Sequence, residues 1–508
     1  MVFNSFTFLI FFPAVVALFF MVPNGKRWIL LLVASYIFYI AWNPVFAILM
    51  FFETVAVYIA AITIQKTSPD YLKKWILAVA ISINLTLLIF FKYYNFFEAE
   101  LSKFGWISSE DYVLNIVLPL GISFYTFHAI SYVVDAYRGR VETERHLGVL
   151  LLYIAYFPLL VAGPIARAEH LLPQLNKLTR NDIASVTYFE YHRTVSGLRL
   201  MLLGYVKKLV LADNFAKFVQ PVYTTPDDYS GLSAITATLA FAIQIYFDFS
   251  AYTDIARGAS RIFGIDLTEN FRNPYFASNI QDFWRRWHIS LSTWFRDYLY
   301  IPLGGSRVNS TRTFINLTLV FLLCGFWHGA NWTFLIWGAL HGIYIYTSHI
   351  KNRITDTASV QQIKLANNSS KWMRIFVTFS LVVFAWVMFR AETMDKGFSI
   401  WRNIILTPYE AIQYLYLVLF EGVRFSPLNA IGLKWLLLLN GKFTLLFIYI
   451  CPLAVIYFIF EYKIQELNSW NEFGHWSIRS RWISYVFALT LIYLLADFGN
   501  NQFIYFQF

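Results

Sequence analysis

Charged residues are scarce in this 508-residue sequence, where Asp, Glu, Lys and Arg together make up 14%. Soluble chains usually carry about a quarter charged residues and are about half hydrophobic. Here hydrophobic residues reach 58% and aromatic residues 20%. This composition excludes an ordinary soluble protein and predicts an all-α, polytopic membrane protein.

Cysteine is nearly absent from the chain. The two cysteines, Cys324 and Cys451, both lie within apolar runs. Neither their number nor their spacing fits a disulfide framework or a thiolate metal site, so we expect no bound metal. We predict that both are small buried hydrophobic residues.

Processing signals and soluble catalytic motifs are also missing. The apolar run 6–22 has no basic stretch ahead of it, so we predict a retained first helix with its N-terminus outside, rather than a cleavable signal peptide. The sequence contains no G-x-S-x-G nucleophile motif, no internal repeat and no long flexible linker. We therefore expect a single membrane domain over residues 1–508.

The positive charge, +10 net, gathers in short clusters between apolar runs. Such clusters are typical of the cytoplasmic loops that determine membrane topology, so we expect no binding of nucleic acid. The clusters are Lys26 with Arg27, Lys73 with Lys74, Arg138 with Arg140 and Arg145, and Lys207 with Lys208.

Thirteen apolar runs approach the roughly 20 residues that a membrane helix needs. Several are short or interrupted by glycine or proline, so we predict about 11 to 13 membrane-embedded helices. The polar segments 350–372 and 461–481 are predicted loops, and 421–442 is predicted to lie partly at a membrane interface. The runs are 6–23, 28–42, 45–64, 75–92, 113–134, 147–166, 196–212, 231–250, 314–327, 332–349, 374–390, 443–460 and 482–497.

Residues 268–307 are too polar to cross a bilayer, yet they are rich in tryptophan and tyrosine. Ser278 and Gln281 form a capping-box pattern and Pro302 supplies a stop, so we predict one helix between them. Two interpretations stay open: an amphipathic helix at the membrane surface, or the wall of a cavity for an acidic or nucleotide-bearing ligand. The aromatic stripe of this helix comprises Trp284, Trp287, Leu291, Trp294 and Tyr298.

Two carboxylates, Asp248 and Asp254, lie near the end of an apolar run. Ionisable groups at membrane depth usually face a bundle interior or a water-filled cavity, and a structural and a functional role are equally open. Their spacing directs them to different faces of a helix. Arg257 and Arg261 are the predicted partners of Asp254.

A histidine stands within the apolar stretch GFWHGANW, at position 328. Counted from Phe314 it lies about 20 Å along a helix, inside the hydrocarbon region. A lone buried histidine is more often structural than catalytic. However, Gly325 and Gly329 leave room beside His328 for another backbone or for a ligand. His341 follows on another face of the helix, if the helix is continuous.

Six separate motifs together resemble the membrane-bound O-acyltransferase family. The sequence is most similar to the alginate O-acetyltransferase branch of bacterial polysaccharide acetylation proteins, and more distantly similar to the D-alanyl transferase of teichoic acid. The motifs are GISFYTFHAISYVVDAYRG (121–139), VAGPIAR (161–167), YFDFSAYTDIARG (246–258), ENFRNPY (269–275), FWRRWHISLSTWFRDYLYIPLGG (283–305) and FWHGANWTFLIWGALHG (326–342), with IYFQF at 504–508.

This resemblance implies a ring of membrane helices around a central tunnel, where acyl donor and acceptor meet from opposite sides. The family core then spans about 113–349. The resemblance further implies O-acetyl transfer from acetyl-CoA as donor substrate, with no bound cofactor, to an exported or cell-wall polysaccharide. It also implies a periplasmic serine-esterase-like acetyltransferase as partner, and a location in the bacterial inner membrane.

The family's active-site histidine corresponds to His328, and a second implicated histidine corresponds to His288. A neutral imidazole is suited to act as a general base, which is the role we predict for His328. We predict that His288 orients the donor or stabilises the developing oxyanion. Phosphates of the donor are expected to attract Arg285, Arg286 and Arg296. The predicted substrate-binding residues are Asn270, Arg285, Trp287, Arg296 and Asn331.

Three alternatives stay open from the sequence. Within the enzyme class, the transferred group is D-alanine or another acyl group, and the acceptor is a teichoic acid, a lipid or a protein. Interrupted helices and intramembrane carboxylates are also typical of a transporter. The third alternative is a non-catalytic scaffold of an export complex.

Overall fold

The computed structural model describes residues 1–106, 116–181, 188–357, 369–420, 449–466, 477–496 and 503–504. Every regular element in this part of the chain is helical, which confirms the all-α prediction. The chain forms two compact units: unit 1 combines Met1–Tyr205 with Tyr252–Asn270, and unit 2 combines Val206–Ala251 with Phe271–Phe508. The single domain expected from the sequence stays a prediction.

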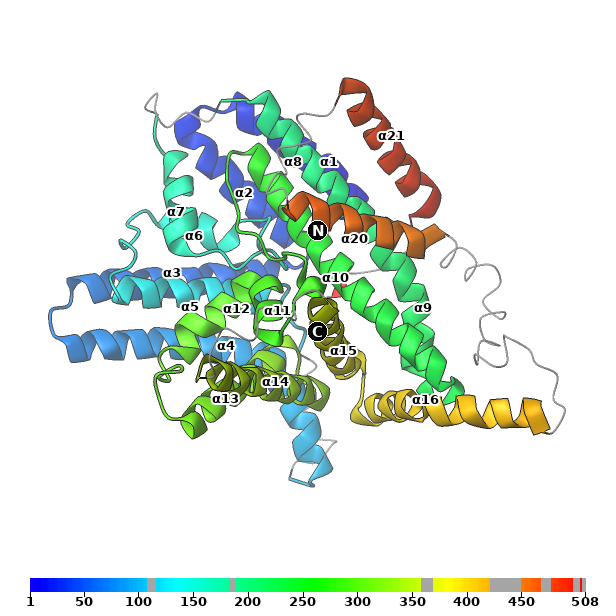
Figure 1. The fold of residues 1–508 in the computed structure, drawn as a ribbon. Coiled ribbons are helices and arrows are strands. Elements are labelled where there is room, and N and C mark those ends of the chain that lie inside the picture. The colour runs from blue at the N-terminus through cyan, green and yellow to red at the C-terminus, as the bar shows by residue number, and fades with distance from the viewer. Residues whose placement is uncertain are drawn as a thin grey trace. The chain divides into compact units, whose positions relative to one another are not determined.

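Unit 1 contains the first eight α-helices and the end of the long helix α10. Helices α3, α4 and α5 pack against one another and lie side by side in Figure 1. The helices are α1 (Phe6–Met21), α2 (Arg27–Ile40), α3 (Pro44–Lys66), α4 (Asp70–Lys103), α5 (Ile122–Tyr137), α6 (Leu147–Ala155), α7 (Ala168–Lys177) and α8 (Tyr191–Tyr205).

Unit 2 contains the remaining helices, of which two short ones, η3 and η6, are π-helical. Helices α13 and α14 form the most extensive helix pair and lie next to α11 and α12 in Figure 1. The elements are η3 (Val206–Ala212), α9 (Asp213–Thr224), α10 (Gly231–Ile262, which ends in unit 1), α11 (Ile280–Arg286), α12 (Ile289–Phe295), η6 (Arg296–Tyr300), α13 (Ser310–His328), α14 (Trp332–Thr357), α15 (Ser369–Arg390), α16 (Met394–Phe420), α20 (Cys451–Glu466) and α21 (Ile478–Leu495).

Six helices of the described chain are long and apolar enough to cross a membrane, so the protein is a multi-pass membrane protein. Helix α1 is apolar but shorter. The larger number predicted from the sequence also counted shorter runs, such as 147–166, where only 147–155 are helical. The six are α3, α4, α10, α13, residues 370–390 of α15, and α21.

Side-chain caps mark where the spanning helices α3 and α13 begin. The Asn43 side chain accepts a hydrogen bond from the Val45 N–H, and proline follows as the first residue of α3. In the same way, Asn309 accepts from the Arg312 N–H at 2.8 Å and starts α13. Such caps satisfy backbone donors that have no partner within the helix, which matters most in an apolar environment.

Two segments that were predicted to be loops are helical at both ends. Helix α14 continues to Thr357 and α15 begins at Ser369, so residues 350–357 and 369–372 are helical. Likewise, α20 extends to Glu466 and α21 begins at Ile478. Residues 421–442 and 505–508, including most of the IYFQF motif, lie outside the described residues.

Helices α13 and α14 approach each other so closely that glycine is required at the contact. A Cβ atom on Gly325 would lie 2.2 Å from the Phe334 carbonyl oxygen, and one on Gly338 would lie 2.3 Å from the Phe321 carbonyl oxygen. Small residues at helix contacts are a common device of membrane proteins. The space beside His328 that the glycines predicted is therefore filled, at Gly325, by the backbone of α14.

A buried ion network lies in unit 2, on the π-helix η3. The ammonium group of Lys208 lies 2.7 Å from Asp248 and 2.8 Å from Asp213. The second carboxylate oxygen of Asp248 accepts the Ile504 N–H at 2.7 Å, and the Lys208 ammonium lies 4.4 Å from the centre of the Phe503 ring. The network therefore fixes a short piece of the C-terminal segment within this unit.

The neighbouring Lys207 is buried as well, and its ammonium lies 3.4 Å from Glu461. The other carboxylate oxygen of Glu461 accepts the Tyr246 hydroxyl at 2.6 Å. Because both lysines are 1% exposed, the prediction that Lys207 and Lys208 occupy a cytoplasmic loop is wrong. Their charges are compensated by buried carboxylates rather than by water, and two of these carboxylates, Asp248 and Glu461, are far away in the sequence.

Candidate active site

The polar aromatic segment is not the single helix that its periodicity predicts. Helix α11 begins at Ile280, and its N-cap is Asn279, whose side chain accepts from the Asp282 N–H, and not Ser278. The helix ends at Arg286, the next residue, Trp287, is extended, and α12 begins after His288. His288 has φ 42° and ψ 56°, a left-handed conformation that costs about 1–2 kcal/mol in a residue with a Cβ atom. Such strain is typical of functional sites.

His288 serves as the cap of α12, because its Nδ1 accepts the Leu291 N–H at 3.3 Å. Nδ1 is thus an acceptor, so the neutral ring carries its hydrogen on Nε2. The side chain is 1% exposed and packs on Phe249, with 4.6 Å between ring centroids. Burial lowers the pKa of the His288 imidazole to about 3, which keeps the ring neutral at physiological pH.

His328 is the last residue of α13 and is 5% exposed. Three aromatic rings surround its imidazole: Trp327, Trp337 and Phe389, with centroids at 4.9, 5.3 and 5.1 Å. All three contacts are edge-to-face, and the Trp337 plane stands at 88° to the imidazole. The imidazole is therefore held in one orientation at the end of a membrane-crossing helix.

The two histidines predicted from separate motifs share a neighbour. The Trp327 ring contacts the His328 ring and, at 6.3 Å and 86°, also the His288 ring. A single indole therefore lies between the two imidazoles. The structure brings together side chains that are 40 residues apart in the sequence.

A cavity of about 470 Å³ lies between the polar aromatic segment and α13. Its interior is mostly apolar, and two of its lining residues, Arg285 and Arg296, are exposed arginines. On α13 it extends as far as Cys324, which lies one helical turn before His328. The lining residues on the helices are Gln281, Trp284, Arg285, Ile289, Leu291, Ser292, Thr293, Phe295, Arg296, Tyr300, Leu317, Val320, Phe321, Cys324 and Ile345.

Trp284, which lines the cavity, is in contact with a third histidine and with a tryptophan beside His328. The Trp284 indole N–H donates to His341 Nδ1 at 3.3 Å. The Trp284 ring contacts Trp337 at 5.8 Å, and Trp337 contacts His328. The sequence offered His341 but no role for it, because only the fold brings Trp284 and His341, 57 residues apart, into contact.

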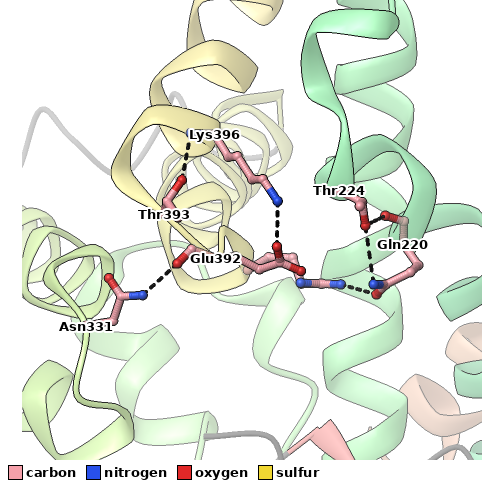
Figure 2. Close-up of polar contacts among 7 residues, drawn as sticks. Gln220, Thr224, Asn331, Glu392, Thr393 and Lys396 are labelled. Carbon is pink, nitrogen blue, oxygen red and sulfur yellow. Dashed lines mark hydrogen bonds and ion pairs between the residues drawn. The ribbon is translucent and has the colours of Figure 1, made fainter. Parts of the chain in front are cut away.

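At the end of α13, Asn331 fixes the turn into α14. Its side-chain oxygen accepts the Thr333 N–H at 3.1 Å, and its amide group donates to the Glu392 carbonyl at 2.7 Å. Figure 2 shows this link together with the ion pair of 2.6 Å between Lys396 and Glu392. Asn331 therefore joins the turn after His328 to the α15–α16 connection.

Polar contacts continue from α15 to α9. The guanidinium of Arg390, the residue after Phe389, donates to the Gln220 side-chain oxygen. Figure 2 shows Gln220 next to Thr224, whose hydroxyl donates to the Gln220 carbonyl at 2.8 Å. A polar collar, formed by Gln220, Thr224, Asn331, Arg390, Glu392 and Lys396, thus lies next to the residues that surround His328.

Two further predicted substrate-binding residues lie in the interior. Trp287 is 2% exposed and packs between Phe271 at 5.0 Å and Trp386 at 5.1 Å, within unit 2. Asn270 is 1% exposed and is the last residue of unit 1. A role in substrate binding stays a prediction for both residues.

Arg257 and Arg261 were predicted to pair with Asp254 in unit 1, and the structure confirms Arg257. Asp254 lies 3.6 Å from Arg257, which also lies 3.6 Å from Glu269. Arg261 instead approaches Asp266 at 3.9 Å. Within the described residues, no group of three His, Cys, Asp or Glu side chains is arranged to hold a metal ion.

Comparison with known proteins gives consistent matches. The model of the MBOAT, membrane-bound O-acyltransferase family, matches residues 146–389, which include His288 and His328. The chain is 38% identical over 413 residues to a probable alginate O-acetylase of Azotobacter vinelandii, covering 79% of this chain and 77% of the relative. It is 36% identical over 405 residues to a peptidoglycan O-acetyltransferase of Helicobacter pylori, covering 75% and 73%. It is 27% identical over 297 residues to a teichoic acid D-alanyltransferase of Streptococcus thermophilus, covering 55% and 70%.

Proposed function

Because the chain belongs to the membrane-bound O-acyltransferase family, we propose that it moves an acetyl group from cytoplasmic acetyl-CoA to a hydroxyl group on the opposite side of the membrane. The chain is an O-acyltransferase. The names of its relatives favour an exported or cell-wall polysaccharide as the final acceptor and the inner membrane of a bacterium as the location. A periplasmic serine-esterase-like acetyltransferase is the proposed partner, since the acetyl group can be handed over through its serine hydroxyl.

One observation supports this proposal above all: a single helix carries both the cavity wall and His328. Leu317 and Cys324 line the cavity, and His328 follows Cys324 by four residues, or about 6 Å along the helix. A donor in the cavity therefore has its reactive end near the imidazole. The polar collar lies at the same end of α13, where a hydroxyl acceptor would approach.

The charges at the helix ends support this direction of transfer. The segments before α13, after the middle of α14 and at the start of α15 are basic, whereas the turn after His328 and the α15–α16 connection carry fewer basic residues. By the positive-inside rule, His328 belongs to the outer end of α13. The basic residues at the inner end are Arg307, Arg312, Lys351, Arg353, Lys371 and Arg374.

The proposed chemistry uses the His328 imidazole as a general base beside a thioester. The acceptor oxygen attacks the thioester carbonyl carbon while His328 accepts the hydroxyl proton. The carbon–sulfur bond then breaks, an ester bond remains, and His328 returns the proton to the coenzyme A thiolate. General-base assistance of this kind contributes about 10²–10⁴-fold to the rate. His288, with its hydrogen on Nε2, is suited to donate a hydrogen bond to the donor.

If acetyl-CoA binds in the cavity, replacing either of the two exposed arginines there should weaken its binding. Arg285→Ala and Arg296→Ala are each expected to raise the KM for acetyl-CoA about tenfold with little change in kcat, because a charge-assisted contact to phosphate acts before the chemical step. The measurement is the transfer of label from radiolabelled acetyl-CoA into hydroxylamine-sensitive esters, with membranes that contain the chain and its partner.

An acyl donor without phosphates distinguishes a loss of phosphate binding from a general loss of activity in the two arginine variants. With S-acetyl-N-acetylcysteamine, which has no nucleotide, both variants should match the parent protein. Arg312→Ala, at an exposed position of α13, serves as control and should leave both donors unaffected. Unchanged KM values for acetyl-CoA in both cavity variants would contradict the donor assignment. Failure of the parent protein to label any acceptor from acetyl-CoA would contradict the proposed function itself.

A further inference from the structure

The reaction proposed for His328 and His288 gives no role to the indole nitrogen of Trp337. Trp337 is 1% exposed, and its Nε1 is buried without a hydrogen-bond acceptor among the residues that the structure describes. Tryptophan offers only this one donor and no acceptor. A buried N–H group without an acceptor costs about 1–3 kcal/mol, so its retention at such a position calls for an explanation.

The location of Trp337 connects it to the reaction centre. Its ring lies 5.3 Å from the His328 ring, in a perpendicular arrangement. It also contacts Trp284, which lines the cavity, with 5.8 Å between the ring centroids. Trp337 therefore contacts both a residue that lines the proposed donor cavity and the proposed base.

The surroundings of Trp337 hold its ring in place. It is stacked on Trp386, with 5.8 Å between ring centroids and 18° between the planes. Phe389 at 5.2 Å and His341 at 4.9 Å also pack against it, each in an edge-to-face arrangement. A donor that is fixed before the substrate arrives needs no reorganisation during the reaction, which is the requirement for stabilising a developing charge.

We propose that the Trp337 N–H donates a hydrogen bond to the carbonyl oxygen of the acyl donor and stabilises the negative charge that this oxygen acquires. The inference rests on the proposed function, because it assumes an acyl thioester in the cavity. When the acceptor oxygen bonds to the carbonyl carbon, the π electrons of the carbonyl group move to its oxygen, which then accepts the Trp337 N–H. When the carbon–sulfur bond breaks, the charge leaves with the thiolate, which takes the proton from His328.

The test removes the N–H group and keeps the ring. Trp337→Phe is expected to lower kcat for acetyl transfer about 10²–10³-fold, the usual cost of losing one oxyanion donor, with the KM for acetyl-CoA changed by about twofold at most. Replacement of Trp337 by benzothienylalanine exchanges the N–H group for sulfur within the same bicyclic shape. It should reduce kcat to a similar extent, although the packing against Trp386 and Phe389 is retained.

Trp332→Phe is the matched control, because Trp332 lies on the same helix with its side chain 45% exposed; its kcat should equal that of the parent protein. Thermal unfolding of each detergent-solubilised variant separates a loss of fold from a loss of chemistry. Full kcat in the benzothienylalanine variant would overturn the proposal, whether or not Trp337→Phe folds. Absence of acetyl transfer in the parent protein would instead overturn the proposed function and remove the basis of this inference.

Discussion

Replacing His328 with alanine is expected to abolish O-acetylation of the polymer, with acetyl ester content falling at least about 10²-fold, because the reaction loses its general base. The imidazole ends α13, and three aromatic rings hold it in orientation. The measurement is the acetyl ester content of exported polysaccharide from cells that carry only the variant chain. His328→Gln, which keeps polarity but is no base, should be equally inactive.

The control for His328 must show that the membrane protein still folds. His170 is an exposed histidine at the start of α7, and His170→Ala should leave acetylation unchanged. The amount of each variant in the membrane, and its elution as a single species in detergent, should equal those of the parent protein. Normal acetylation in a folded His328→Ala variant would remove His328 from the catalytic role.

The second large effect is expected at the buried ion network of unit 2. Lys208→Ala leaves the carboxylates of Asp213 and Asp248 buried without their cation, and removal of one partner of such a network costs about 3–5 kcal/mol. We expect the variant to be degraded, or to unfold at a clearly lower temperature. The measurement is the unfolding temperature of the detergent-solubilised protein, followed by its aggregation on heating.

Replacing all three charged residues with uncharged ones tests whether the unpaired buried carboxylates cause the loss of stability. The triple variant Lys208→Met, Asp213→Asn and Asp248→Asn should recover much of the lost stability, since replacing all partners of a buried ion network is often neutral. Lys26→Ala, at an exposed lysine, should change stability by no more than about 0.5 kcal/mol. An unchanged unfolding temperature for Lys208→Ala would show that the buried charges do not stabilise the fold.

The helical class was accessible from sequence because it depends on local signals, and the catalytic roles of the two histidines stay predictions. Composition and apolar run length identify membrane helices, and the motifs around His288 and His328 are long enough to be specific. The break between α11 and α12 was not accessible, because the helical spacing continues through Trp287 and His288 with neither glycine nor proline. The contacts of His288 with Phe249 and Trp327, far away in the sequence, accompany the left-handed backbone.

The wrong prediction that Lys207 and Lys208 lie in a cytoplasmic loop has a similar cause. Two adjacent basic residues beside an apolar run have the composition of a cytoplasmic loop. Asp213 is only five residues from Lys208, but the other two partners lie 40 residues away at Asp248 and 254 residues away at Glu461, and no local pattern connects the lysines to them. Likewise, Gly325 correctly indicated a close approach, but the sequence alone did not distinguish the backbone of α14 from a ligand.

Reconstitution in liposomes tests most directly whether the protein transfers the acetyl group from one side of the membrane to the other. The purified chain would be placed in liposomes with a hydroxyl acceptor, or the partner protein, sealed inside and radiolabelled acetyl-CoA added outside. For molecules whose donor side faces outward, we predict acetyl esters on the enclosed acceptor, with none formed by the His328→Ala variant. Esters formed only on acceptor supplied on the same side as acetyl-CoA, or equal labelling by the variant, would contradict transfer across the membrane at His328.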